Sequence, residues 1–178
     1  MVHILDIRII HMYTIIMAKK ESSIFQEIGF TKPSGRVPEA IIYSLARTFN
    51  TVSKRLANVY SRFGLTAASF NLLMLLKHGK DRNSFTQREL GSRLVASPSN
   101  MTGLIDRLEE RQLVSRLNGA DRRSKLLQIT TKGAKLLDDV WPFHIEAIQE
   151  LTQSLSDKET QILLSSLSQL RQLVGSES

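Results

Sequence analysis

Residues 86–133 decide the fold, and they read TQRELGSRLVASPSNMTGLIDRLEERQLVSRLNGADRRSKLLQITTKG. Thr86 and Glu89 have the spacing of a capping box, so a short helix is expected to begin there. Ser97 and Pro98 then suit the N-cap and the first position of a second helix, which is expected to run to about residue 111. The apolar residues of this second helix follow the i, i+3, i+4, i+7 spacing of one buried face: Met101, Leu104, Ile105 and Leu108.

Two apolar segments after this helix are predicted to pair as a β-hairpin. They are LVSRL and LLQI, and the turn dipeptide Asn118-Gly119 lies between them. The tip of the hairpin, residues 119–125, reads GADRRSK. From residue 111 to residue 135 the chain has seven basic residues and the single acid Asp121. Taken alone, such a tip fits a solvated turn as well as a contact to phosphate.

Two helices are predicted upstream of this stretch. Apolar residues at every third or fourth position indicate a long amphipathic helix from Pro38 to about Phe63, ended by Gly64. Thr66 as N-cap and Gly79 as C′ residue delimit the next helix, which is apolar on most sides.

Two more helices are predicted downstream. The first begins at about Lys132, and Pro142 is expected to kink it. The second begins at another capping box, formed by Ser156 and Glu159. Because the apolar stripes of the outer helices exceed what one small core can bury, we expect a two-fold homodimer.

The composition limits the class of protein. The chain has 178 residues, 42% of them hydrophobic, which suits a globular domain with long helices. The formal net charge of +7 predicts attraction to polyanions. The absence of cysteine excludes disulfides, thiolate catalysis and zinc–thiolate sites, and it fits a cytoplasmic protein. The four histidines show no metal-ligand spacing, so no metal or other cofactor is expected. We see no nucleophile–base pair or phosphate loop, so the chain is predicted not to be an enzyme.

The first twenty residues, MVHILDIRIIHMYTIIMAKK, are apolar but include Asp6 and Arg8. They lack the basic start and cleavage site of a signal peptide, and their uninterrupted apolar run is too short to span a bilayer. No membrane association is therefore expected. Residues before Met17 are interpreted as an extension upstream of the natural start, the alternative being a strand or a partner-binding arm.

The order helix, short strand, helix, turn, helix and basic hairpin predicts a winged helix-turn-helix. The expected fold is mainly α with a small β-hairpin wing and long N- and C-terminal dimerisation helices. Residues 86–133 resemble the DNA-binding core of the MarR family of bacterial transcriptional regulators, chiefly in the wing sequence DRRS followed by LQITTKG. One departure is Gln112, which stands where the family commonly has glycine.

The expected domain organisation follows from this resemblance. We predict a leader over residues 1–35, a dimerisation helix over 36–64, a DNA-binding domain over 65–131 and C-terminal dimerisation helices over 132–178.

The second helix of the pair is expected to enter the major groove of double-stranded DNA, where small polar side chains approach base edges. The resemblance implies that Arg122 and Arg123 approach a narrow minor groove and that Asp106 pairs with Arg123. Asp121 is not expected to contact DNA; it is expected to accept hydrogen bonds that fix the wing loop, or to orient an arginine. Simple helix capping is an alternative role for Ser99. The residues expected to contact DNA are Ser97, Ser99, Asn100, Thr102, Gly103, Arg107, Arg122, Arg123 and Lys125.

The resemblance implies a repressor, or less often an activator, that binds an inverted-repeat operator as a homodimer. It also implies release by a small aromatic or phenolic effector, for which no ligand-binding residues are assigned. Trp141 and His144 could line such a site, although packing is the favoured role. Two alternatives stay open: a ligand-insensitive architectural DNA-binding protein, and a winged helix used for protein contacts. The basic wing argues against the second, because interface cores are depleted in charge.

Overall fold

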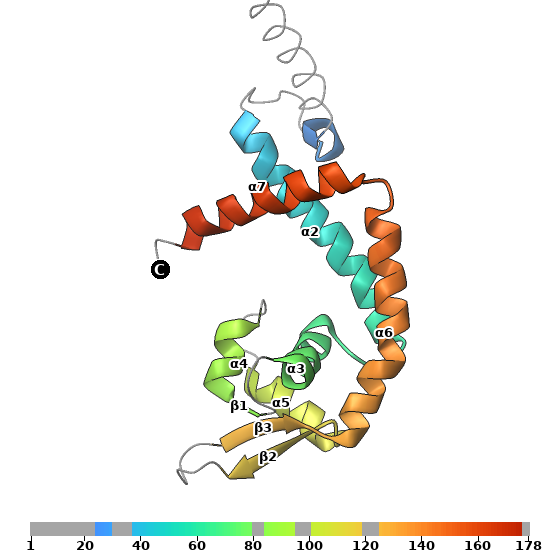
Figure 1. Ribbon diagram of the computed structural model, residues 1–178, viewed down its shortest axis with the longest axis vertical. Helices are drawn as coiled ribbons and strands as arrows, with labels where there is room; N and C mark the ends of the chain where they lie inside the picture. The colour runs from blue at the N-terminus through green and yellow to red at the C-terminus, as the bar shows by residue number, and fades with distance from the viewer. Residues whose placement is uncertain (1–23, 30–36, 80–83, 95–100, 119–124, 176–178) are drawn as a thin grey trace, which may run out of the picture. The chain divides into compact units, whose positions relative to one another are not determined.

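The computed structural model describes residues 24–29, 37–79, 84–94, 101–118 and 125–175. The chain forms two compact units, Met1–Lys54 and Arg55–Ser178. It is mainly helical with one small antiparallel sheet, as predicted (Figure 1). Within the described ranges, no helix is long and apolar enough to cross a membrane. The elements are α2 (Val37–Ser61), α3 (Ala67–His78), β1 (Phe85–Thr86), α4 (Gln87–Arg93), α5 (Met101–Glu110), β2 (Val114–Asn118), β3 (Lys125–Ile129), α6 (Thr131–Thr152) and α7 (Asp157–Gly175).

The sheet has three antiparallel strands in the order β1-β3-β2, so the predicted hairpin is confirmed and β1 adds a third strand. Leu127 of β3 lies between Phe85 of β1 and Arg116 of β2. The hairpin register ends with Asn118 opposite Lys125. The segment 119–124 that joins these two residues, and with it the tip of the wing, lies outside the described residues.

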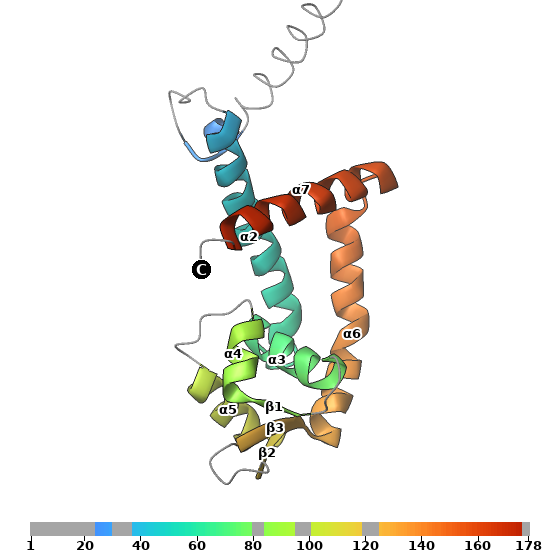
Figure 2. The same cartoon turned by 60° about the vertical axis from the view of Figure 1, so that its left-hand side comes forward.

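The helices α3, α4 and α5 and the three-stranded sheet form the predicted DNA-binding lobe, whose core lies where these helices pack on the sheet (Figure 2). The predicted apolar stripe of α5 is confirmed, since each of its four residues is at most 6% exposed. Leu72 and Leu73 of α3 and Leu90 of α4 are fully buried beside it. Burial of this apolar surface is the main force that holds α5 in place, which leaves its opposite face toward solvent.

Three of the predicted N-terminal caps are present, and the fourth, Ser97 with Pro98, lies outside the described residues. Thr86 accepts a hydrogen bond from the backbone N–H of Glu89 (3.2 Å), and Glu89 accepts one from the N–H of Thr86 (2.7 Å). Ser156 and Glu159 form the same reciprocal pair at the start of α7. Thr66 accepts from the N–H of Ser69 at the start of α3. Each cap satisfies donors that the first helical turn leaves without a partner.

Gly64 ends α2, as predicted, in a left-handed conformation with φ of +67°. The N–H of Leu65 donates to the carbonyl of Tyr60, and the N–H of Gly64 donates to the carbonyl of Ser61, both at 3.0 Å. These two bonds define a Schellman motif, in which glycine adopts positive φ without steric cost.

Gln112 ends α5 in the same way, although it is not glycine. Leu113 N–H donates to Leu108 O (2.9 Å) and Gln112 N–H donates to Glu109 O (2.7 Å), which is a second Schellman motif. Among the described residues, Gln112 is the one non-glycine residue with positive φ, at 60°. This conformation explains physically why glycine would suit the position, and it places strain at the end of α5.

Gly79 ends α3 as predicted, but the expectation of a C′ role is wrong. Gly79 is the C-cap itself, in an extended conformation with φ of −62° and ψ of 135°. Glycine is required for space instead: a Cβ atom here would lie 2.4 Å from Cζ of Phe85 and 2.5 Å from the carbonyl oxygen of Leu75.

An aromatic cluster joins the end of α2 to α3 and α6. Tyr60 stacks on Phe70 with ring centroids 4.3 Å apart, and His144 lies 4.8 Å from Phe70 and 5.3 Å from Trp141. Burial raises the pKa of Tyr60 to about 12 and lowers the pKa of His144. The Tyr60 hydroxyl therefore keeps its proton at neutral pH, and it forms a hydrogen bond of 3.0 Å with Nδ1 of His144, in which the tautomer of the imidazole decides the donor.

Pro142 lies inside α6 without ending it, since the helix continues from Thr131 to Thr152. The proline ring removes the N–H that would bind the carbonyl of Asp138. The predicted kink at this position stays a prediction.

Replacement of Gln112 by glycine should stabilise the protein. Removal of Cβ relieves left-handed strain of roughly 1–2 kcal/mol, partly offset by the entropy of glycine in the unfolded chain, so we expect a net gain of about 0.5–1 kcal/mol. Urea unfolding of Gln112→Gly measures it. Gln153→Gly is the matched control, because Gln153 caps α6 with φ of −57°. Equal effects of the two substitutions would contradict the strain at Gln112.

Candidate nucleic-acid interface

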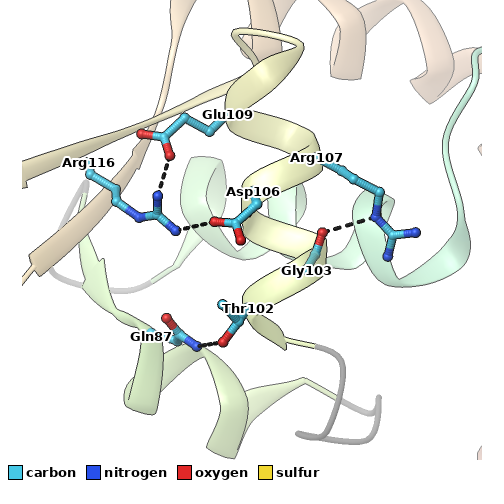
Figure 3. Close-up of polar contacts among 7 residues, drawn as sticks. All are labelled: Gln87, Thr102, Gly103, Asp106, Arg107, Glu109 and Arg116. Carbon is cyan, nitrogen blue, oxygen red and sulfur yellow. Dashed lines mark hydrogen bonds and ion pairs between the residues drawn. The ribbon is translucent and has the colours of Figure 1, made fainter.

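The solvent face of α5 presents the predicted contact residues together. Thr102, Gly103 and Arg107 are exposed, and Asp106 is half-buried beside them (Figure 3). The 3.6-residue period of the helix produces this arrangement. The apolar residues that begin at Met101 lie on one face and are buried in the core, so the residues between them lie on the opposite face and are exposed.

Two hydrogen bonds order side chains on this face. Nε2 of Gln87 donates to the Thr102 hydroxyl oxygen at 2.8 Å, which links α4 to α5. Nε of Arg107 donates to the carbonyl oxygen of Gly103 at 3.0 Å, so this arginine folds back along its own helix (Figure 3). The remaining guanidinium nitrogens of Arg107 can still bind an anion.

Arg116 of β2 ties the wing to α5. Its Nη2 lies 2.5 Å from Oδ1 of Asp106, and its Nη1 pairs with Glu109 (Figure 3). The hydrogen bond to Asp106 raises the pKa of Arg116, so the guanidinium stays charged. Because Asp106 and Glu109 are three residues apart, they share one face of α5 and receive the two arms of a single guanidinium.

The C-terminal end of α5 contacts both the end of α2 and the start of α6. Nη1 of Arg111 donates to the carbonyl oxygen of Gly64 at 2.5 Å, which binds the end of α2. The hydroxyl of Thr130 donates to the carbonyl oxygen of Gln112 at 2.7 Å, which binds the start of α6. A Cβ atom on Gly133 would lie 2.1 Å from the carbonyl oxygen of Leu113, so α6 passes this turn at backbone distance. These contacts set the position of α5 within the lobe.

Metal chemistry has no visible basis in the described part of the chain. No group of three or more His, Cys, Asp or Glu side chains is placed there to hold an ion. The arrangement on α5 is instead one of exposed hydrogen-bonding groups beside a basic hairpin, which is suited to contact with a polyanion.

Comparison with known proteins agrees with this geometry. The sequence profile of the MarR family matches residues 63–124. The regulator MhqR of Bacillus subtilis is 29% identical over 119 residues, 66% of this chain and 80% of MhqR. YkoM of the same organism, an uncharacterised HTH-type transcriptional regulator, is 31% identical over 121 residues, 67% of this chain and 77% of YkoM. The chain belongs to the MarR family.

A solved structure supports the membership. A mutant of MarR from E. coli, complexed with operator DNA, is 25% identical with a TM-score of 0.66, and the match covers 82% of this chain and 96% of that one. MarR-family proteins are transcriptional regulators that bind DNA. This chain is accordingly a DNA-binding regulator and not an enzyme, as predicted.

The predicted site residues of this MarR-family protein are only partly described. Thr102, Gly103, Asp106 and Arg107 lie together on α5, and Lys125 begins β3. The others lie outside the described residues: Ser97, Ser99, Asn100, Asp121, Arg122 and Arg123. The predicted pair of Asp106 with Arg123 therefore stays a prediction, and the described partner of Asp106 is Arg116.

The sequence analysis missed the roles of Gln87 and Arg116. The spacing of Asp106 and Glu109 signals a shared helical face. Seven basic residues follow between positions 111 and 135, however, and the pattern does not say which of them meets these acids. Gln87 follows a capping threonine and carries no signal of its own.

Loss of the Arg116 side chain should loosen the wing. Arg116→Ala leaves Asp106 and Glu109 as unneutralised neighbours, so we expect the free energy of unfolding to fall by about 1 kcal/mol. Arg116→Lys should recover only part of this, because an ammonium lacks the two-armed geometry. Urea unfolding measures both variants against Arg171→Ala, at an exposed arginine on α7. An Arg116→Ala variant as stable as this control would show that the ion pairs contribute nothing.

Proposed function

We propose that the chain is a ligand-responsive repressor that binds an inverted-repeat operator as a homodimer, with α5 in the major groove and the wing at the flanking minor groove. One observation carries this proposal: Thr102, Gly103 and Arg107 are exposed together on α5, beside the two strands that lead to the tip GADRRSK. The similarity to a MarR mutant of E. coli that was solved in complex with operator DNA supports operator DNA as the ligand.

In this proposal α5 is the recognition helix, and the residues of the wing and those just before α5 have defined roles. Arg122 and Arg123 enter the minor groove, Lys125 binds backbone phosphate, and Asp121 holds the wing loop. Ser97, Ser99 and Asn100 precede α5 in the sequence, and the proposal assigns them to phosphate and base contacts, which short side chains near the start of a recognition helix can make. Arg116 neutralises Asp106 and Glu109, which would otherwise repel phosphate.

The exposed apolar residues support the homodimer. They are large side chains that a second copy would remove from water, and a two-fold dimer would present two recognition helices to half-sites about 10 bp apart. On α2 they are Ile41 (49% exposed), Ile42 (59%) and Phe49 (64%), and on α7 they are Ile162 (57%), Leu163 (46%), Leu164 (58%) and Leu173 (71%).

A small aromatic or phenolic effector completes the proposal. Such a ligand would bind more tightly to a dimer conformation in which the spacing of the recognition helices does not match the two half-sites than to the DNA-binding conformation. It would thereby shift the population away from the DNA-binding conformation and release the operator. This part of the proposal rests on the family resemblance, and no residue of the chain is assigned to it.

The proposal predicts sequence-selective DNA binding that depends on the wing. Duplexes selected from a random pool with the purified protein should bind far more tightly than scrambled duplexes. Arg122→Ala/Arg123→Ala should weaken operator binding at least tenfold. It should also make the slope of log binding constant against log salt concentration shallower, by about two released counterions per protomer. Lys132→Ala/Lys135→Ala removes the same charge from exposed positions on α6, and should change both quantities less.

The outcomes separate the alternatives. Equal affinity for selected and scrambled duplexes would indicate an architectural DNA-binding protein. Failure of a folded protein to bind any duplex would favour a winged helix used for protein contacts. A double arginine variant no weaker than the double lysine control would contradict the role of the wing.

Gly103→Ala should raise stability and lower operator affinity. A glycine inside a helix costs about 1 kcal/mol relative to alanine. A Cβ atom at Gly103 meets nothing within 4 Å in the free protein, so packing does not explain the glycine, whereas close approach of DNA does. Gly91→Ala in α4 is the control, because a Cβ atom there also meets nothing within 4 Å. We expect both variants to unfold at higher urea, and only Gly103→Ala to lose operator affinity. Unchanged affinity of Gly103→Ala would place the DNA farther from α5.

A further inference from the structure

Gln87 is the first residue of α4, and its side chain points at Thr102 on α5 (Figure 3). The two side chains are exposed, and Nε2 of Gln87 lies 2.8 Å from Oγ1 of Thr102. The capping box of Thr86 and Glu89 fixes the backbone that carries Gln87. The bond therefore joins the two helices of the helix-turn-helix at their surface, and the capping box holds the backbone of Gln87 in place.

The hydrogen bond has a defined polarity. A carboxamide nitrogen only donates, so the hydroxyl oxygen of Thr102 is the acceptor. A hydroxyl has a single proton, and because the oxygen accepts from Gln87, that proton is left for another acceptor. Among the described residues, no acceptor takes it.

Two other helical threonines behave differently. The hydroxyls of Thr51 and Thr152 donate to the carbonyls of Arg47 and Ile148, one turn earlier in their own helices. This is the usual local use of a helical threonine hydroxyl. At Thr102 the described bond comes instead from another helix and uses the oxygen as acceptor, which orients the hydroxyl.

We propose that Gln87 is a positioning residue that makes Thr102 a hydrogen-bond donor to DNA. The acceptor is N7 of a purine in the major groove or a phosphate oxygen, both of which accept and never donate. Gln87 holds the hydroxyl in the orientation that donates before DNA arrives, so binding does not have to order it. The inference rests on the proposed function, because it assigns a donor to the face of α5 that meets DNA.

A double-mutant cycle separates this role from a direct contact of Gln87 with DNA. Gln87→Met keeps the length of the side chain and removes the donor, and Thr102→Val keeps the shape and removes the hydroxyl. Each should weaken operator binding about five- to tenfold, and the double variant should bind no more weakly than Thr102→Val. Additive losses would overturn the proposal, because Gln87 would then act independently of Thr102.

A structural brace between α4 and α5 would give a different result. It would shift the urea midpoint of all three variants, whereas a positioning role leaves their midpoints near that of the wild type. Thr102→Ser keeps the hydroxyl, so it should recover most of the affinity. Failure of serine to restore binding would overturn the assignment of the hydroxyl as donor.

Modified operators identify the acceptor. The operator is the duplex selected with the wild-type protein, with 7-deazapurine at each purine in one series and methylphosphonate at each phosphate in the other. One replacement per half-site should lower the operator affinity of the wild-type protein five- to tenfold, whereas the affinities of Thr102→Val and Gln87→Met should not change. A deazapurine effect assigns the donor to a base, and a methylphosphonate effect assigns it to the backbone.

Two negative results are distinguishable. If every replacement lowers the operator affinity of Thr102→Val as much as that of the wild type, the proposal for Gln87 and Thr102 is overturned, whereas the proposed function as a DNA-binding regulator is not. If no duplex is selected at all, the proposed function itself fails.

Discussion

The turn at residues 111–113 is the constraint on which the arrangement of the DNA-binding lobe depends. Arg111 binds the end of α2, Gln112 closes α5 in a left-handed conformation, and Leu113 lies buried at the start of the wing. Thr130 and Gly133 bring the start of α6 against the same turn. The recognition helix therefore has a fixed C-terminal end, and its angle to the wing and to the start of α6 is set within three residues. Strain at Gln112 is borne by this dense set of contacts.

The charges on α5 are arranged in a way that is compatible with the proposed contact to DNA. Asp106 and Glu109 would repel phosphate if they stood alone. Arg116 satisfies both from β2, so it removes the repulsion and at the same time orients the hairpin. These ion pairs are partly exposed, with 30% of the Arg116 side chain accessible. Their contribution to stability is accordingly modest, and their main consequence is geometric.

Several features of the chain are unfavourable in the free monomer. Gly103 weakens a helix without a packing reason, and large apolar side chains such as Phe49 and Leu164 face solvent. Positions of this kind are reasonable in a protein whose working state has partners, since DNA and a second subunit would cover them. Under the proposed function, stability and function therefore place opposite demands on the same residues.

The sequence by itself determined the parts of this protein that depend on neighbours along the chain. The capping boxes, the buried stripe of α5, the Gly64 terminus and the hairpin all follow from spacings of a few residues, and they were sufficient to predict the winged fold and the exposed face of α5. Only the tertiary structure decided which of seven basic residues meets Asp106, that Gln87 reaches Thr102, and that Gly79 is needed for space beside Phe85. The physical reason is that these contacts form between elements brought together by folding. Their distances depend on how helices and strands pack, which no local pattern of residues contains.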